Sequence, residues 1–257
     1  VQLRGAYEAI KGLEGYQNEN YIEYNVETKL AFPRIIAPFL SDGFRKRNRM
    51  KSELLFSYNL QNRPEFHRRV LTAAWRYHWS MSKKKSSFRY DFLDINYVYM
   101  PWISATFKKE YLDDVSNRNA ILRYNYEDIF ILRTGLNYSF SDSKNALRSN
   151  IEVGGNLLYA ISNLFGEKRN AQNQYTLFKI AYAQYVKGDF DYTRLVKIDT
   201  KNTLALHFGL GIAYPYGNST ILPFEKRYFS GGANSVRGWN VRALGPGKFK
   251  GKDGRID

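Results

Sequence analysis

Residues 204–214 read Leu-Ala-Leu-His-Phe-Gly-Leu-Gly-Ile-Ala-Tyr, so every second side chain is large and apolar. The side chains between them are small or polar: Ala205, His207, Gly209, Gly211 and Ala213. Successive side chains of a β-strand point to opposite faces of the sheet, so a period of two predicts a strand with one apolar face. The alternation decides the class of fold, because a helix would instead repeat its apolar residues about every 3.6 positions.

The same alternation recurs along the rest of the chain. Trp75, Tyr77 and Trp79, for example, form an aromatic face opposite small and polar residues. About nine strands are predicted in this way, near residues 1–10, 21–33, 50–61, 67–81, 87–108, 120–140, 147–161, 175–188 and 203–216. Most of them reach the roughly 9–11 residues that a tilted strand needs to cross a bilayer, whereas globular strands are usually nearer about 5–6.

The composition agrees with a membrane barrel. The 257 residues are 16% aromatic and yet polar on average, with a mean hydropathy of −0.52. A barrel places its apolar residues at every second position, so an averaged hydropathy barely registers them. No stretch approaches the ~20 consecutive apolar residues of a membrane-spanning helix. We therefore predict an all-β fold, an antiparallel transmembrane β-barrel, over a soluble sandwich or a lipocalin-like barrel, whose dry core would have to pair every charge on the polar face.

Other classes of function are disfavoured by what the sequence contains. The absence of cysteine excludes disulfides and thiolate chemistry, and three histidines are too scattered to predict a metal site. The formal charge of +15 sits in clusters spread over successive connectors, a pattern that favours anionic lipid headgroups and not nucleic acid. No serine elbow, paired-carboxylate site or phosphate loop is found, so neither an enzyme nor a cofactor is predicted.

One segment after the last strand carries a distinctive motif. Residues 223–239 read Pro-Phe-Glu-Lys-Arg-Tyr-Phe-Ser-Gly-Gly-Ala-Asn-Ser-Val-Arg-Gly-Trp. The paired glycines permit positive φ, and the bulky apolar residues of this loop need something to pack against. Arg237 would then enter a confined place, where its planar guanidinium requires a carboxylate or several carbonyl oxygens. We predict that the loop folds back into the polar interior of the barrel.

This motif resembles the lumen-inserted sixth extracellular loop of the BamA/TamA outer-membrane assembly family, also described as bacterial surface antigen barrels. The matching positions, which are the predicted site residues, are Phe229, Gly231, Gly232, Val236, Arg237, Gly238 and Trp239. Most members of the family have Phe or Tyr where Trp239 stands. A weaker likeness covers residues 29–33, which resemble the end of the family's fourth strand, and the many Tyr and Asn residues are similar to the Bacteroidetes-type members.

The resemblance implies a particular place for this chain in a larger barrel. The family barrel has sixteen strands, with the motif loop between the eleventh and the twelfth. Residues 1–257 are therefore expected to be a partial barrel domain, comprising strands three to eleven and the start of the sixth extracellular loop. The periplasmic POTRA domains and the remaining strands, including the one that carries the acidic partner of Arg237, are expected to lie outside this chain.

The resemblance also implies a function. Family members are outer-membrane assembly, insertion or translocation factors, which receive client β-barrel proteins by strand augmentation at a lateral seam. The implied partners are outer-membrane lipid, client outer-membrane proteins and accessory periplasmic or lipoprotein subunits. Two alternatives stay open: a transport pore of the two-partner-secretion or porin-like type, and a barrel that anchors a larger enzyme in the membrane.

Overall fold

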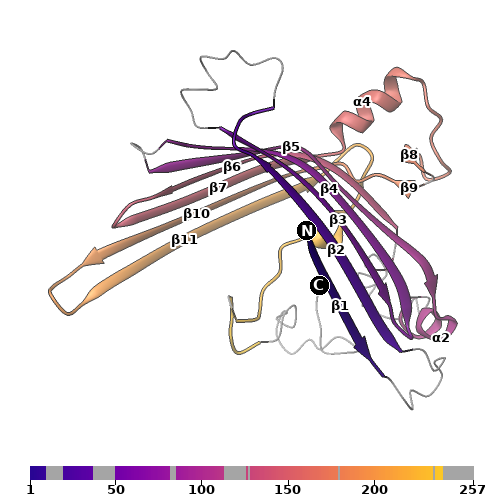
Figure 1. Cartoon of the computed structure of the whole chain (residues 1–257), viewed down its shortest axis with the longest axis horizontal. Helices are drawn as coiled ribbons and strands as arrows, with labels where there is room; N and C mark the ends of the chain where they lie inside the picture. Colours follow the sequence, from indigo (N-terminus) through magenta and orange to yellow (C-terminus); the bar gives the residue numbers. More distant parts are fainter. Residues whose placement is uncertain are drawn as a thin grey trace.

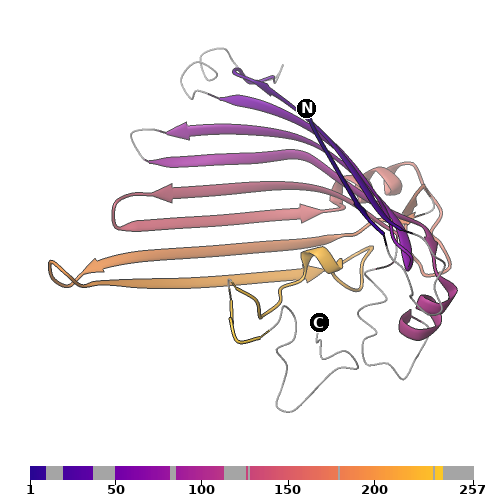
Figure 2. The same cartoon turned by 60° about the horizontal axis from the view of Figure 1, so that its bottom comes forward.

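The computed structural model describes residues 1–9, 20–36, 50–81, 85–112, 126, 128–178, 180–233 and 235–239. Nine strands form one curved antiparallel sheet in the order β1-β2-β3-β4-β5-β6-β7-β10-β11 (Figures 1 and 2). The strands are β1 (Gln2–Glu8), β2 (Tyr21–Phe32), β3 (Lys51–Asn62), β4 (Phe66–Met81), β5 (Ser86–Ile103), β6 (Ile129–Ser141), β7 (Asn145–Gly154), β10 (Tyr185–Lys197) and β11 (Thr203–Pro215). Each of these strands pairs with the next one along the chain, except that β7 pairs with β10, and this confirms the predicted all-β antiparallel fold. The sheet is open, with β1 and β11 as its edges in the described part of the chain.

Short elements cluster at the end of the sheet where β5, β7 and β11 finish. A one-turn helix α2 (Ala105–Phe107) and a π-helix η2 (Lys108–Leu112) follow β5, and a 3-10 turn η4 (Phe224–Lys226) follows β11. Between β7 and β10 the chain forms helix α4 (Asn156–Leu164) and a small hairpin, β8 (Thr176–Leu177) with β9 (Ile180–Ala181). Among the described residues, no helix has the length and apolar character needed to cross a membrane.

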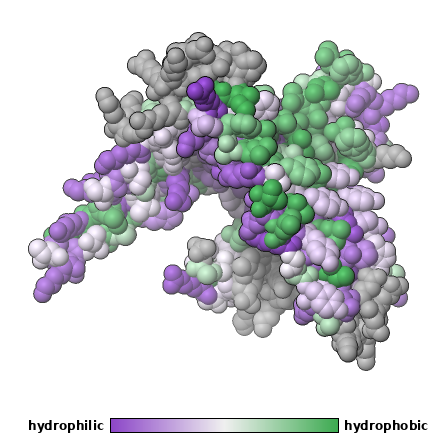
Figure 3. All heavy atoms as spheres, in the orientation of Figure 1, coloured by the Kyte–Doolittle hydropathy of each residue, from purple (hydrophilic) through white to green (hydrophobic). Residues whose placement is uncertain are grey.

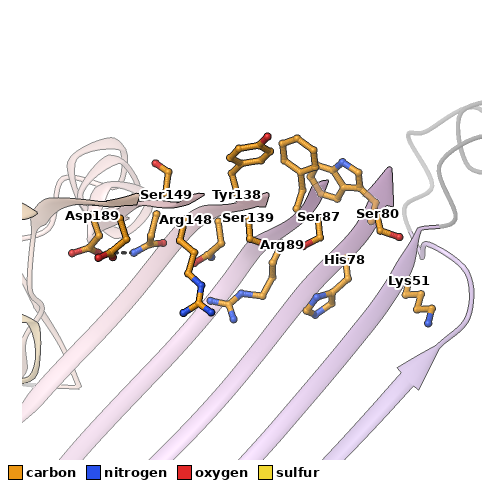
Figure 4. Close-up of a pocket in the computed structure, with 15 residues that line it drawn as sticks. Lys51, His78, Ser80, Ser87, Arg89, Tyr138, Ser139, Arg148, Ser149 and Asp189 are labelled. Carbon is orange, nitrogen blue, oxygen red and sulfur yellow. Dashed lines mark hydrogen bonds between the residues drawn. The ribbon is translucent and has the colours of Figure 1, made fainter. Parts of the chain in front are cut away.

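The two faces of the sheet differ as the alternation predicts. On one face large apolar side chains remain exposed, as with Phe208 at 57% and Ile212 at 64%. The other face carries charged and amide side chains, among which the carboxylates of Asp91 and Asp94 are buried. Figure 4 shows the division at one end of the strands, where Arg89 and its basic neighbours point to one side and Tyr138 to the other.

One part of the apolar face is covered by the protein itself. Tyr77 is buried, because Ile35 and Met50 pack on it together with partly buried Trp75 and Trp79. Its hydroxyl donates a hydrogen bond of 3.0 Å to the carbonyl of Ile36. The aromatic face predicted for β4 therefore lies on the apolar side of the sheet, but Tyr77 contacts the connection after β2 and is not open to lipid.

The strand predicted at residues 147–161 is wrong beyond Gly154. Gly155 has a φ of 76°, which ends the extended backbone, and a Cβ there would lie 2.4 Å from the Ala183 carbonyl. The residues after it form α4. The period of two continues through Leu157, Tyr159 and Ile161. The same segment also has the helical spacing i, i+4, i+7, at Leu157, Ile161 and Leu164.

Two further boundaries need correction. The strand predicted at 175–188 is instead the β8–β9 hairpin, and β10 runs nine residues past the predicted end, to Lys197. Gly188 and Arg194 occupy apolar-face positions of β10 and interrupt the pattern, whereas pairing with β7 and β11 holds these residues in the sheet. The strand predicted at 87–108 ends at Ile103, because Ser104 N donates to Glu65 O instead of continuing the ladder.

The two turns at the other end of the sheet share one sequence pattern and one hydrogen-bond pattern. Asp142-Ser-Lys-Asn joins β6 to β7, and Asp199-Thr-Lys-Asn joins β10 to β11. In each turn the aspartate Oδ1 accepts from the backbone N–H groups of the third and fourth residues, at 2.6–2.7 Å. Such side-chain to backbone bonds fix the turn and thereby the register of both strands.

We expect these two carboxyl groups to titrate below their ordinary value of 3.8. The Lys144 and Asn145 backbone N–H groups lower the pKa of Asp142, and the Asn202 side chain, with the Lys201 N–H, lowers the pKa of Asp199. Because the pKa falls on folding, the carboxylates stabilise the turns above the ordinary value, and this stabilisation is lost as the pH falls through the folded-state pKa. Carboxyl carbon shifts followed by NMR in micelles provide the measurement; a midpoint at or above 3.8 for either group would contradict it.

Candidate functional site

A row of ion pairs crosses the polar face of the sheet from β3 to β7. Arg76 lies 3.5 Å from a Glu53 oxygen and 3.2 Å from an Asp94 oxygen. Arg133 then bridges Asp94, at 2.7 Å, and Glu152, to which it donates a short hydrogen bond. Five side chains from five adjacent strands thus form one continuous network, which we call the charged wall.

Strand register accounts for the charged wall. Cross-strand pairing sets Arg76 opposite Glu53, and Arg133 opposite Asp94, so each base meets an acid on the neighbouring strand. Asp94 and Glu152 are both only 3% exposed. A buried carboxylate is tolerated only when it is paired and hydrogen-bonded, and Glu152 also accepts from the Tyr185 hydroxyl at 3.1 Å.

The chain after β11 turns back and joins the charged wall through η4 (Figure 2). Glu225 accepts hydrogen bonds from Arg68 on β4, at 2.8 Å, and from the Asn96 amide on β5, at 3.0 Å. The ammonium of Lys226 lies 2.9 Å from a Glu152 oxygen on β7. Two consecutive loop residues of opposite charge therefore contact three strands.

Tyr228 anchors the loop farther across the sheet, on β10. Its hydroxyl donates to Asp189 Oδ1 at 2.5 Å and lies 3.0 Å from the Gly188 carbonyl, and the Lys187 ammonium lies 4.3 Å from the ring centroid. The ring occupies space that Gly211 on β11 leaves open, since a Cβ there would lie 2.5 Å from the Tyr228 Cζ atom. A side chain at this position of β11 would therefore displace the Tyr228 ring.

The start of the loop is fixed by buried polar and apolar contacts. Asn218 donates to the carbonyls of Tyr175 and Tyr182, both at 2.9 Å, and accepts from the Tyr175 N–H at 2.6 Å. Leu222 packs beside buried Ile131 and Tyr185 on the polar side of the sheet. The segment between β11 and η4 is therefore folded and fixed in direction before it reaches the charged wall.

The predicted site residues form a compact turn beyond these anchors. Gly231 and Gly232 have φ of 101° and 88°, as expected of paired glycines, and Gly232 N donates to Trp239 O at 2.8 Å, which closes the turn. Phe229, Val236, Arg237, Gly238 and Trp239 are exposed. Arg237 donates from Nε to the Ala233 carbonyl at 3.2 Å, within the same turn. A carboxylate on a later strand as its partner stays a prediction.

Sequence reasoning missed the residues that hold the loop to the sheet. In the loop they are Glu225, Lys226 and Tyr228. On the strands of the sheet they are Arg68, Asn96, Glu152, Asp189 and Gly211. The loop residues lie within the motif of residues 223–239, but their partners come from strands up to 157 residues away in sequence. One sequence feature could have indicated these anchors. An acidic and a basic residue, Glu225 and Lys226, stand next to each other shortly before Tyr228, in a loop that folds onto a face carrying charges of both signs.

The polar face also forms a hollow of about 660 Å³ near the turns at the opposite end from η4. Figure 4 shows its lining, in which His78, Arg89 and Arg148 point to the same side of the sheet and the acidic Asp189 lies at one end of the row. Asn150 donates to Asp189 at 3.0 Å and holds this carboxylate between the hollow and Tyr228. The hollow and the loop therefore share the side chain of Asp189, which lines the hollow and accepts the hydrogen bond from Tyr228.

The sequence matches the Omp85 superfamily domain over residues 15–254, nearly the whole chain. The chain belongs to the Omp85 superfamily. This confirms the predicted barrel class and its outer-membrane location. A search for similar curated proteins returned no significant match.

Membership of the Omp85 superfamily assigns meanings to the two faces of the sheet. Omp85 proteins are non-enzymatic factors for assembly and transport of proteins at the outer membrane, so the apolar face meets lipid and client proteins are among the partners. The polar face lines the lumen, and η4 with Tyr228 lies on it. A wet lumen also explains why a face with so many charged groups is compatible with a stable barrel.

Replacing Gly211 with alanine is expected to release the loop from the wall. The added methyl group would overlap the Tyr228 ring, and displacing the ring breaks the bond to Asp189. Gly209→Ala is the matched control, since its Cβ would approach only the Asp191 oxygen, at 3.3 Å. Limited proteolysis of the refolded full-length protein reads out the loop; equal cleavage within residues 216–239 in both variants would refute the packing role.

Glu152→Gln should destabilise the barrel much more than Glu225→Gln. Neutralising buried Glu152 leaves Arg133 and Lys226 short of a charge partner, which costs about 3 kcal/mol by analogy with broken buried ion pairs. Glu225 is one-third exposed, and its loss is expected to cost about 1 kcal/mol or less. Urea unfolding in lipid vesicles measures both free energies, and equal losses would show that the charged wall is not buried as described.

Proposed function

We propose that this chain is the barrel part of a BamA/TamA-type factor that inserts client β-barrel proteins into the outer membrane. The observation that carries the proposal is the loop after β11, which crosses the lumen and bonds to strands β4, β5, β7 and β10. Conduction does not require a fixed loop across the bore, although transport pores of a related type also carry a similar loop. A barrel that must keep its shape while its wall opens does gain from one.

The proposed mechanism follows from the cost of unpaired backbone groups in lipid. An unpaired N–H or C=O costs several kcal/mol in the hydrocarbon core, so a weakly paired seam invites an incoming strand to complete it. The client satisfies these groups by β-augmentation and leaves as a closed barrel. In the proposal the seam lies between strands outside residues 1–257, and the loop holds the remaining wall in register while the seam exchanges partners.

The finer assignments rest on the motif and on composition. We propose that residues 1–257 correspond to strands three to eleven and the start of the sixth extracellular loop of a sixteen-stranded Bacteroidetes-type barrel. The POTRA domains, and accessory periplasmic or lipoprotein subunits, would supply and orient the clients. Arg237, at the tip of the turn closed by Gly232 and Trp239, would reach a carboxylate on a later strand.

Arg237→Ala in the full-length protein is expected to lower client assembly several-fold while the barrel stays folded. Arg237→Lys should share the defect, because an ammonium lacks the planar fork that a carboxylate binds in two places. Lys201→Ala, in the turn between β10 and β11, is the matched loss of a positive charge away from the loop. Folding of a radiolabelled client barrel in vesicles measures assembly, and heat-modified migration in gels measures the barrel itself.

Normal client assembly together with an unchanged barrel in Arg237→Ala would refute the role of the arginine. The alternatives give different results. A two-partner-secretion or porin-like pore would show steady single-channel conductance and no effect on clients. A barrel that anchors a larger enzyme would support membrane attachment of that enzyme, again with client assembly unaffected.

A further inference from the structure

The segment between β7 and β10 leaves the barrel wall and packs on its lipid-facing side. β7 ends at Gly154, and the chain returns to the wall at Tyr182, which forms a parallel bridge with Phe130 of β6. Leu158 and Tyr159 of α4 pack against the cluster that contains Phe130 and Leu132, both on the apolar face. The excursion therefore covers a patch of wall that would otherwise meet lipid.

The covered patch lies at the start of β6, which runs from Ile129 to Ser141. Phe130 and Leu132 are buried there, in one cluster with Tyr175, Ile180 and Tyr182 of the returning chain. Partly buried residues of β5 pack against the same cluster from the neighbouring strand. Helix α4, with the β8–β9 hairpin, takes the place of lipid over this end of β6.

Helix α4 has three distinct faces. Leu158, Tyr159 and Ser162 face the wall. A second face is apolar and exposed, at the spacing i, i+4, i+7 and i+8 of a continuous helical stripe, and consists of Leu157, Ile161, Leu164 and Phe165. The third face is small and polar, and consists of Asn156, Ala160 and Asn163.

The apolar stripe is too exposed to be part of the packed interior. Leu164 is 82% exposed and Phe165 is 76% exposed, at the end of a helix that closes with a positive-φ glycine, Gly166. Phe178, at the tip of the β8–β9 hairpin, is 77% exposed. In Figure 3 the apolar surface over the end that carries α4 runs on without a break into the apolar surface of the neighbouring strands.

We propose that α4 is an interfacial membrane helix that seats its apolar stripe in the outer leaflet, beside the barrel. The stripe continues a surface that is already in contact with lipid, and exposed apolar surface of this kind is typical of membrane interaction sites. On the polar third face, Ala160 and Asn163 then point to water, while Asn156 accepts hydrogen bonds from Gln184 at 2.9 Å and Tyr216 at 2.7 Å. This is the arrangement of an amphipathic helix lying in the interface, its apolar side sunk roughly 5–10 Å into the headgroup and acyl boundary.

The proposal depends on the outer-membrane barrel and not on the assembly role, so it is tested without any client. This chain has no cysteine, so a single introduced thiol marks one position in it. Leu164→Cys and the adjacent Asn163→Cys carry a nitroxide label on the apolar and polar faces of the same helix turn. Both side chains are exposed, so neither change disturbs packing.

The full-length protein is reconstituted in vesicles of phosphatidylethanolamine and phosphatidylglycerol, and collisions with oxygen and with a water-soluble nickel chelate are measured by electron paramagnetic resonance. Oxygen concentrates in lipid and the nickel complex in water. The oxygen-to-nickel collision ratio is expected to be several-fold higher at position 164 than at 163. Leu210→Cys on the apolar face of β11 provides the lipid reference, and Lys201→Cys in the turn before it provides the water reference.

Two results would overturn the proposal. A label at 164 that resembles the one at 201 would mean that the stripe faces water. A label at 164 that is immobilised and shielded from both reagents would mean that protein covers it, either another part of the chain or a second subunit.

Discussion

One antiparallel sheet in this protein has to meet two different surroundings, and the period of two along each strand is what makes that possible. Lipid contacts the face that carries Phe208 and Ile212, while charged groups on the opposite face need water or a partner. The cross-strand register then places acidic residues next to basic residues of the neighbouring strand. Arg133 therefore forms ion pairs with both Asp94 and Glu152. Every other feature of the molecule, including the returning loop, depends on this division.

The loop after β11 uses charged side chains on the polar face of the sheet as its partners. Three residues anchor it. Glu225 pairs with Arg68, Lys226 pairs with Glu152, and the Tyr228 hydroxyl donates to Asp189. Because these partners lie on different strands, the loop connects parts of the wall that are far apart in sequence. Such a strut resists changes in barrel shape, and the proposed insertion mechanism depends on this property. The turn at Arg237 lies beyond these anchors, on a stem that is already fixed.

The strands could be predicted from the sequence wherever the two faces alternate without interruption, as in β3, β4 and β11. Prediction failed where the alternation and the backbone disagree. Residues after Gly155 keep the period of two and yet form a helix, because a left-handed glycine turns the chain off the wall. β10 has Gly188 and Arg194 on its apolar side, and only its two neighbouring strands hold it in the sheet. The motif loop could be recognised from its glycines and Arg237, but its anchors could not, since each depends on a partner that only the register of distant strands brings near.

The most direct test of the account asks whether η4 lies in the lumen of the full-length protein in its membrane. Cysteines at Asn96 and Glu225, whose side chains are hydrogen-bonded at 3.0 Å, can be joined by a short bifunctional thiol reagent. The adjacent residue Tyr97 lies on the apolar face of the same strand and gives the matched pair with Glu225. If η4 lies in the lumen, position 225 is joined to position 96 and not to position 97. Joining to 97, or to neither, would contradict a lumen that holds this loop.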